Sequence, residues 1–438
     1  MTRFTQCLAP GAALAFFLGL AGNALADGCN NTPFADWLQE VKQEAAAKGI
    51  SPAAIQNLDG LTYDPKVIAM DRKQGVFAQT FLTFAGRMAN NYRLTNGKKY
   101  MDEYAGLFSK LEAEFGVPAP VVVAFWSLET DFGANTGSFD TLRSLATLAH
   151  DCRRPEKFRP QLISALEIIE KGYLTPAEMK GAWAGELGQT QFLPSDYIEN
   201  GVDGDNDGRI DLLKSKPDVL ASTSKLVASF GWRRGEPWLE EVAVPENLPW
   251  EKADLKVMLP RKDWARMGVT QVGGAPIKAD GLEASLLLPM GKNGPAFLAY
   301  QNFRVYTEWN KSLVYCTTAA YMATRMAGAP AMSPGRAPIE TLSLEDTKQL
   351  QQILQSKGYD VGKIDGVLGE GSRAAVREEQ IKLGMPADSY PTKEFLIRMG
   401  GTPTPAEPAK PATPAAPAAP EAAPGAVPAP KAKPALVL

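Results

Sequence analysis

Apolar side chains recur at helical spacing over most of the chain up to Gly328. The clearest repeats are Trp37, Leu38, Val41 and Ala45, and then Tyr104, Leu107, Phe108, Leu111 and Phe115. Spacing of three and four residues places such side chains on one face of a helix. Strand-like runs appear only late, around residues 286–288 and 303–306. The pattern predicts a mainly α domain that begins near Phe34.

Residues 1–26 have the features of an export signal. Arg3 gives a positive start, residues 9–21 are apolar and small, and residues 24–26 (Ala-Leu-Ala) form a small-x-small cleavage site. The apolar run is too short for a stable membrane span. We therefore expect export to the periplasm and a mature chain without a membrane span.

Cleavage at this position removes Cys7 and leaves three cysteines, Cys29, Cys152 and Cys316. An exported protein can form disulfides, but three thiols allow three different pairs and leave one cysteine unpaired. The sequence does not choose among these pairs. Cys29 also raises the alternative of a lipoprotein, but the Ala-Asp-Gly before it lacks the small, uncharged pattern of a lipid-attachment site.

Three further segments follow the main domain, which is predicted to cover residues 27–328. Residues 329–341 are rich in Pro, Gly and Ser and form a linker. Residues 342–399 form a small helical unit in which Ser343 caps the first helix. Residues 400–438 are mostly Pro and Ala, and we expect a disordered tail because such a composition cannot bury a core.

Composition and charge exclude several classes of function. Lys and Arg number 46 and Asp and Glu 49, so the formal charge of −3 gives no electrostatic footprint for nucleic acid. The one histidine, His150, excludes a HExxH zinc site and makes any Ser-His-Asp or Cys-His catalysis depend on that residue. No P-loop or Rossmann glycine pattern follows a plausible strand. Carboxylates remain, and these are the groups that glycan cleavage requires.

Glu129 is the strongest candidate for an acid–base residue. At helical spacing its neighbours are Phe125, Trp126, Phe132 and Gly133. A carboxyl among aromatic rings loses hydration, which raises its pKa and favours the neutral acid that can protonate a leaving glycosidic oxygen. Gly133 is expected to end the helix, which places Glu129 in its last turn. The alternative is a buried glutamate paired with an arginine.

A second segment, from Trp183 to Tyr197, contains small residues, amides, aromatics and a proline. These residues suggest a cleft wall with hydrogen-bond donors for sugar hydroxyls and N-acetyl groups. A Gly-rich turn between two helices would have a similar composition.

A third segment, DGDNDGRID, resembles an EF-hand loop. Asp203, Asp205 and Asp207 occupy positions 1, 3 and 5, and the Arg209 carbonyl occupies position 7. Position 12 is a lysine instead of a bidentate acid, so a later acid such as Asp218 would have to complete the site. We predict a structural Ca²⁺ site, and a simple acidic turn is the alternative.

The order of these segments resembles the lytic murein transglycosylase B family over most of residues 34–328. The motifs that carry the resemblance are GVPAPVVVAFWSLETDFG, LATLAHDCRRPEKFR, WAGELGQTQFLPSDY, the aspartate loop and PDVLAST. The C-terminal unit resembles the peptidoglycan-binding domain type 1 through LQQILQSKGYDVGKIDGVLGEGSRAAV. The resemblance implies a lysozyme-like α domain with additional subdomains, followed by a small three-helix peptidoglycan-binding domain.

The resemblance also implies an activity, which is non-hydrolytic cleavage of the β-1,4 bond between N-acetylmuramic acid and N-acetylglucosamine in peptidoglycan. Glu129 would act first as the acid and then as the base that closes a 1,6-anhydromuramoyl ring. One carboxyl suffices in this family, and the chemistry requires no cofactor. Glu186 is a conceivable second acid.

Carried over by position, Gln191 would contact a sugar, and Asn310, Tyr315 and Trp309 would line the cleft near Glu129. Three positions in the main domain depart from the family pattern. Ala182 replaces a serine that supports the catalytic glutamate, Trp309 stands where tyrosine is usual, and Leu226 stands where an aromatic is frequent. In the small domain, Ser389 interrupts a second Asp-Gly turn. The acid is retained, and its supporting contacts are expected to differ.

Two competing functions remain at this point. A muramidase would hydrolyse the same bond with water. A non-catalytic wall-binding scaffold would explain Ala182 and the Pro/Ala tail.

Overall fold

The computed structural model describes residues 32–72 and 79–405. The predicted signal segment, Cys29 and nearly all of the predicted tail lie outside these residues. The helices of the main domain are α1 (Phe34–Ala47), α2 (Pro52–Ile55), α3 (Pro65–Arg72), α4 (Phe81–Met88), α5 (Asn91–Glu103), α6 (Ala105–Phe115), α7 (Ala119–Thr130), α8 (Thr141–His150), α9 (Pro155–Glu170), α10 (Pro194–Asn200), α11 (Lys216–Ser229), α12 (Arg261–Arg266), α13 (Gln301–Trp309) and α14 (Leu313–Met326). The strands are β1 (Phe139–Asp140), β2 (Lys180–Gly181), β3 (Leu239–Ala243), β4 (Leu259–Pro260), β5 (Thr270–Gln271), β6 (Glu283–Leu287) and β7 (Ala296–Tyr300).

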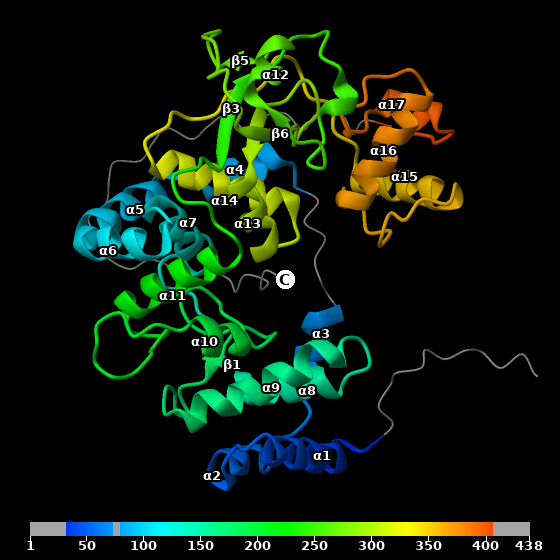
Figure 1. The fold of residues 1–438 in the computed structure, drawn as a ribbon. Coiled ribbons are helices and arrows are strands. Elements are labelled where there is room, and N and C mark those ends of the chain that lie inside the picture. Colours follow the sequence, from blue (N-terminus) through cyan, green and yellow to red (C-terminus); the bar gives the residue numbers. More distant parts are fainter. Residues whose placement is uncertain (1–31, 73–78, 406–438) are drawn as a thin grey trace, which may run out of the picture.

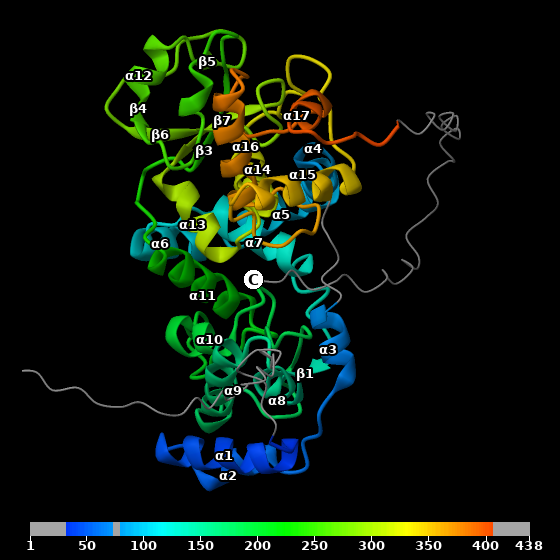
Figure 2. The same ribbon diagram turned by 90° about the vertical axis from the view of Figure 1, so that its right-hand side faces the viewer.

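These elements form a tall molecule with helices α1 and α2 at one end and the larger sheet at the other (Figures 1 and 2). Helix α7 lies between the body that contains α8, α9 and α10 and the body that contains α13 and α14. It packs against α5, α11 and α14. The predicted mainly α, lysozyme-like architecture is confirmed, with α7 as its central helix.

The boundary between α6 and α7 follows from a few residues. Gly116 has φ of +77°, which ends α6 in the left-handed conformation that glycine adopts without strain. Pro118 precedes the first turn of α7, where its missing N–H costs nothing. Residues 121–128 are all buried, so α7 is apolar around its whole circumference, as expected of a core helix.

The larger sheet has the strand order β4-β6-β7-β3-β5, and every neighbouring pair is antiparallel. The strand predicted near residues 286–288 is confirmed as β6. The strand predicted at 303–306 is wrong, because these residues belong to α13. Phe303, Tyr306 and Trp309 are buried at helical spacing there. A short apolar run alone does not distinguish a strand from a buried helical segment.

The C-terminal unit contains three helices, α15 (Leu344–Ser356), α16 (Glu370–Lys382) and α17 (Lys393–Arg398). As predicted, Ser343 caps the first, in a capping box with Asp346. The unit lies beside the larger sheet (Figure 1). Arg373 donates to the carbonyl of Leu288 at 2.6 Å, and the Lys292 N–H donates to the Asp388 carboxylate at 2.9 Å. Side chains of the small domain thus bind the backbone of the main domain.

Two further findings concern disulfides and membrane spans. Cys152 is disulfide-bonded, whereas Cys316 is a free, buried thiol, so the two pairs that include Cys316 are excluded. Within residues 32–72 and 79–405, no single helix is long and apolar enough to cross a membrane. Helices α6 and α7 reach that length only together, and they are bent by 108° at their junction.

Candidate active site

Glu129 lies half-buried in the last turn of α7, as predicted. The helix ends earlier than Gly133, because Asp131 already caps it with φ of +52°. Phe132 and Gly133 are also left-handed, so the chain turns sharply after the helix. Glu129 therefore lies at the C-terminal end of a helix that is otherwise buried.

Two side chains, from α13 and α14, donate hydrogen bonds to the same oxygen of Glu129. The Trp309 indole Nε1–H reaches Oε1 at 2.9 Å, and the Tyr315 hydroxyl reaches it at 2.5 Å. The Trp309 ring stacks on Phe125 with 4.1 Å between centroids, which fixes the indole. Burial, and then the charge of Glu129, raise the pKa of Tyr315 well above its ordinary value, so the phenol keeps its proton and donates.

Glu129 receives its hydrogen bonds without a hydroxyl at position 182. Ala182 is buried and offers no hydroxyl. The donors to Glu129 come instead from α13 and α14. The sequence indicated Tyr315 near the acid, but it did not show that Trp309 compensates for its missing hydroxyl with an indole N–H.

A buried ion pair holds the end of α7. Arg93 on α5 is 5% exposed, and its Nη2 lies 2.5 Å from Oδ1 of Asp131. Its Nε also donates to the carbonyl of Ser127 at 3.2 Å, in the last turn of the helix. An arginine therefore does lie at this helix end, and it pairs with Asp131 while Trp309 and Tyr315 bind Glu129.

Gln189, from the WAGELGQTQF motif, packs against the same helix end. Its Oε1 accepts from the Trp126 indole at 2.9 Å, and its backbone carbonyl accepts from Thr130 at 2.5 Å. A Cβ at Gly133 would lie 2.5 Å from that Oε1, and Gly133 has φ of +88°. Only glycine satisfies both constraints at this position.

Two other predicted cleft residues, Gln191 and Asn310, use polar atoms in hydrogen bonds within the protein. Gln191, half-buried with φ of +55°, donates through Nε2 to the carbonyls of Thr136 and Gly188. Asn310 is buried, and its Oδ1 accepts from the Ser312 N–H at 2.8 Å. These bonds fix the orientation of both amides.

A second carboxyl lies within electrostatic range of Glu129. Glu186 is 5% exposed, and its Oε2 is buried without a hydrogen-bond partner. Burial is the largest cause that raises the pKa of Glu186 to about 7, and the Glu129 charge acts in the same direction. The charges of Lys157 and Arg154 act in the opposite direction. Glu186 thus has the properties of a carboxyl that holds its proton near neutral pH.

The aspartate loop brings three carboxylates together. One oxygen from each of Asp203, Asp205 and Asp218 lies within 4.8 Å of the others. Asp218 is fully buried and accepts the N–H groups of Gly204 and Asp211 at 2.8 and 2.7 Å. Burial raises its pKa, and the Asp205 charge adds to that effect. Hard oxygen ligands in such a group suit a divalent cation such as Ca²⁺.

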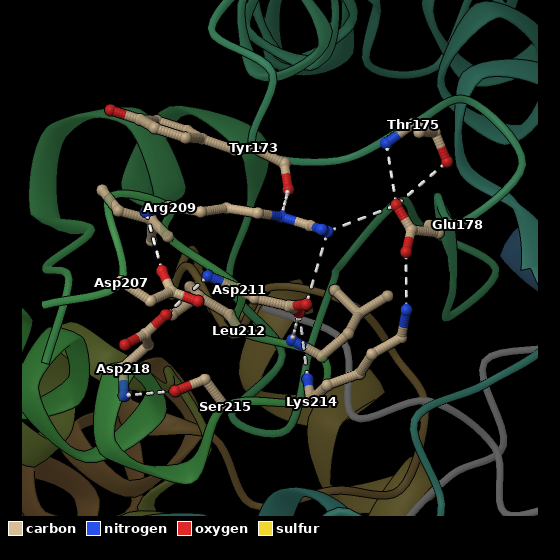
Figure 3. A network of polar contacts seen from close by, with 12 residues as sticks. Tyr173, Thr175, Glu178, Asp207, Arg209, Asp211, Leu212, Lys214, Ser215 and Asp218 are labelled. Atoms are coloured by element: carbon tan, nitrogen blue, oxygen red, sulfur yellow. Dashed lines mark hydrogen bonds and ion pairs between the residues drawn. The ribbon is translucent and has the colours of Figure 1, made fainter. Parts of the chain in front are cut away.

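The remaining predicted ligand positions belong to a polar network that also reaches Asp218 (Figure 3). Asp207 accepts the Arg209 N–H at 2.8 Å and is not in the group of three. Lys214, at position 12, forms an ion pair with Glu178 at 2.5 Å. The Arg209 guanidinium pairs with Glu178 and with Asp211, at 3.2 and 3.3 Å. Asp218 is therefore the acid that lies beside Asp203 and Asp205, at loop positions 1 and 3. The hydrogen bonds and ion pairs of the network hold the rest of the loop.

The Asp-Gly turns of the small domain also have defined places. Gly366, of the first turn, lines a cavity of about 90 Å³ between the two domains, together with Met290 and Tyr390. Ser389 adopts φ of +62° in the second turn and is buried. The second turn therefore keeps a glycine-like backbone although a serine occupies it.

A buried core helix with one carboxyl in its last turn, bound by donors from α13 and α14, is the arrangement expected of a lysozyme-like glycan-cleaving domain. The family model described as "Transglycosylase SLT domain" matches residues 33–324, and "Putative peptidoglycan binding domain" matches residues 343–399. The chain therefore belongs to the transglycosylase SLT family and carries a C-terminal peptidoglycan-binding domain. The membership predicted from the sequence motifs is confirmed, as is the class of enzyme, a peptidoglycan lytic transglycosylase.

Individual relatives agree with this assignment. SltB3 of Pseudomonas aeruginosa, solved in complex with NAG-anhNAM-pentapeptide, is 35% identical with a TM-score of 0.77, covering 84% of this chain and 100% of that chain. Membrane-bound lytic murein transglycosylase B of Escherichia coli is 30% identical over 224 residues, which are 50% of this chain and 60% of that relative's length. The Escherichia coli Slt35 structure with calcium is 24% identical, has a TM-score of 0.57, covers 70% of this chain and 95% of that chain, and shows the fold alone.

Proposed function

We propose that this chain cleaves the β-1,4 bond between N-acetylmuramic acid and N-acetylglucosamine and forms a 1,6-anhydromuramoyl end, with Glu129 as acid and then base. The observation that carries the proposal is the place of Glu129, half-buried at the end of α7 with the Trp309 and Tyr315 donors on one oxygen.

The reaction balances with one carboxyl. Glu129 first gives its proton to the leaving glycosidic oxygen while the C1–O4 bond breaks, and the N-acetyl group of the substrate stabilises the positive charge at C1. The Glu129 carboxylate then takes the proton of the muramoyl C6 hydroxyl, whose oxygen bonds to C1. The proton returns to Glu129, and no water is consumed.

The two donors support the second half of this cycle. Hydrogen bonds from an indole and a phenol stabilise a carboxylate more than a neutral acid. They hold Glu129 in one orientation, which an acid–base group must keep through both proton transfers. Both donors come from α13 and α14, and α14 packs directly against α7.

The test is the mass of the products released from purified sacculi. The proposal predicts muropeptides with anhydro ends, which are lighter by one water than the reducing products of a muramidase. Reducing products would identify the hydrolytic alternative. Negligible release by the folded enzyme would favour the non-catalytic scaffold.

Substrate contacts are proposed from position. Gln191, Asn310 and Tyr315 would line the sugar subsites beside Glu129, and the fixed amide of Gln191 supports a sugar contact. Trp309 is nearly buried and stacks on Phe125, which favours a role as a donor to Glu129 over stacking on a sugar. Glycan strands are also the proposed ligand of residues 342–399.

The proposed substrate lies outside the cytoplasm, which fits export to the periplasm by residues 1–26. The disulfide at Cys152 supports this location, because disulfides persist in oxidising compartments. Of the three pairs that the sequence allowed, Cys29 with Cys152 is the one without Cys316, and we propose this pair for the mature chain.

A structural Ca²⁺ is proposed at Asp203, Asp205 and Asp218. The buried carboxylate of Asp218, on α11, would tie the loop to the helix that packs beside α7. The cation would add stability and has no part in the chemistry.

A further inference from the structure

We propose that the cavity between the main domain and the small domain binds the C-terminal carboxylate of a stem peptide, the peptide that peptidoglycan carries on N-acetylmuramic acid, through the guanidinium of Arg373. The proposal rests on peptidoglycan as the substrate of the chain. It gives the small domain a defined ligand group and assigns the cavity no part in the cleavage at Glu129.

The cavity has walls from both domains and a volume of about 90 Å³. Phe81 and Met290 line it from the main domain, and Leu368 and Tyr390 line it from the small domain. Thr341, an exposed residue of the linker, lines it too, so the cavity reaches the surface. A cavity of about 150 Å³ can hold benzene. This one therefore suits a smaller group, such as the carboxyl end of an alanine.

Arg373, on α16, is the one charged side chain among the described residues that line the cavity. Its Nη2 donates to the carbonyl of Leu288 at 2.6 Å, and its Nη1 donates to the carbonyl of Pro289 at 3.4 Å. These bonds hold the guanidinium against the backbone of the main domain. A guanidinium has five N–H donors, so these two bonds leave donors for a ligand.

The charge of Arg373 is not neutralised by a contacting acid. In the part of the chain that the structure describes, Arg373 has no ion-pair partner. Asp388 acts on it through its charge, but the two oxygens of Asp388 accept from the Gln380 amide and the Lys292 N–H, each at 2.9 Å. Burial lowers the pKa of Arg373, as expected of a cation withdrawn from water. A bound carboxylate would supply the missing partner, with charge-assisted hydrogen bonds.

A second unpaired polar atom indicates what accompanies the carboxylate. Gln79 lines the same cavity, and its Oε1 is buried without a hydrogen-bond partner among the described residues. Buried polar atoms are nearly always paired in proteins, so this acceptor calls for a donor. The last residue of a peptide presents both complementary groups, a carboxylate for Arg373 and an amide N–H for Gln79.

The rest of the lining favours a small apolar side chain on that last residue. Leu342, Leu344 and Val367 add to the apolar surface of the cavity. A methyl group that leaves water for such a surface gains free energy. Stem peptides that end in D-alanine carry the carboxylate, the amide N–H and the methyl group together.

The experiment is a calorimetric titration of the full mature chain with N-acetyl-D-Ala-D-Ala. The wild type should bind this probe. The C-terminal amide of the same dipeptide lacks the negative charge and should bind at least about tenfold more weakly. Acetate, a carboxylate without the peptide N–H, should also bind more weakly than the dipeptide. Because the probe contains no glycosidic bond, its binding does not depend on Glu129, and a failure here leaves the proposed cleavage intact.

Three variants locate the binding site. Arg373→Gln should weaken binding of the dipeptide at least about tenfold. Gln79→Met removes the acceptor and leaves the bonds of Arg373 in place, and it should weaken binding as well. Arg377→Gln is the matched control and should keep wild-type affinity. Arg377 lies on the same helix and donates to the carbonyl of Glu251 in the main domain at 2.6 Å, but it does not line the cavity.

Each outcome decides the proposal. Weaker binding in Arg373→Gln and Gln79→Met, with wild-type affinity in Arg377→Gln, supports it. Failure of the wild type to bind the dipeptide overturns it, as does equal affinity for the dipeptide and its amide. Equal affinity for acetate and the dipeptide would identify a site for any small carboxylate and overturn the assignment to the stem peptide. Equal losses in Arg373→Gln and Arg377→Gln would show that binding depends on the domain contact alone, which also overturns the proposal.

Discussion

Arg93 and Asp131 form an ion pair of 2.5 Å beneath the last turn of α7, two residues beyond the catalytic candidate. Asp131 has φ of +52°, and Arg93 also holds the Ser127 carbonyl of the same turn. The ion pair thus fixes the C-terminal end of α7, two residues after Glu129. The position of Glu129 depends on a partner, Arg93, that lies outside the conspicuous sequence motifs.

Replacing Arg93 with methionine should destabilise the protein by about 3 kcal/mol, because Asp131 loses its buried partner. Urea unfolding measures this loss. Lys98→Met is the matched control on the same helix, since Lys98 pairs with Asp102 at an exposed site 3.5 Å apart and should contribute at most ~1 kcal/mol. Equal losses in the two variants would contradict the structural role of the buried pair.

Tyr315→Phe should lower kcat/KM by about 10- to 100-fold, because a hydrogen bond to a charged group contributes about 1.5–3 kcal/mol. Trp309→Phe should act in the same direction. The melting temperature should change little in Tyr315→Phe. Tyr321→Phe on α14, where the hydroxyl accepts from Met332 and Arg325, is the control and should keep full activity. Full activity in Tyr315→Phe would show that its donor is dispensable.

Ca²⁺ should raise the melting temperature, and a chelator should lower it, because a ligand that binds only the folded state stabilises that state. Asp205→Asn should remove the Ca²⁺-dependent rise. Asp102→Asn, at an exposed position on α5, should retain it. An identical Ca²⁺ response in Asp205→Asn and the wild type would rule out this metal site, and no response in the wild type would leave an acidic turn.

Stability should fall as the pH rises from 4.5 to 7. Over this range folded Glu186, whose pKa is raised to about 7, keeps a proton that the unfolded chain loses. Because the folded state binds more protons, a rise in pH favours the unfolded state. The effect is on the order of 3 kcal/mol. Burial also raises the pKa of Asp196, to about 6, in the same direction. Glu186→Gln should flatten the slope measured by urea unfolding at several pH values, and an unchanged slope would contradict a neutral, buried Glu186.

The sequence predicted the fold class and the elements with strong helical periodicity, because caps and spacing are local signals. Ser343 marks a helix start that the structure confirms. The residues 303–306 were misassigned to a strand because buried helices and buried strands share one composition. The sequence also placed Glu129 in the last turn of its helix. It could not predict the Arg93–Asp131 pair, since nothing local links residues 38 positions apart.

The predicted metal ligands show the same limit. Asp203, Asp205 and Asp218 come together as the loop pattern and the nearby acid suggested, whereas Asp207 turns to the backbone of its own loop. The spacing of acids in a loop indicates candidate ligands, but it does not predict which carboxylates lie close together in the folded protein. Contacts between residues far apart in the chain, such as the indole of Trp309 on Glu129, likewise require the packed structure.

The most direct test of the account is the rate at which Glu129→Gln releases anhydro-muropeptides from purified sacculi, measured by mass spectrometry beside the wild type. Glutamine keeps the shape of the side chain but cannot give or take the proton. The rate should fall by at least about 100-fold, with a melting temperature close to that of the wild type. Release of the same anhydro products at the wild-type rate would contradict the assignment of Glu129 as the acid and base.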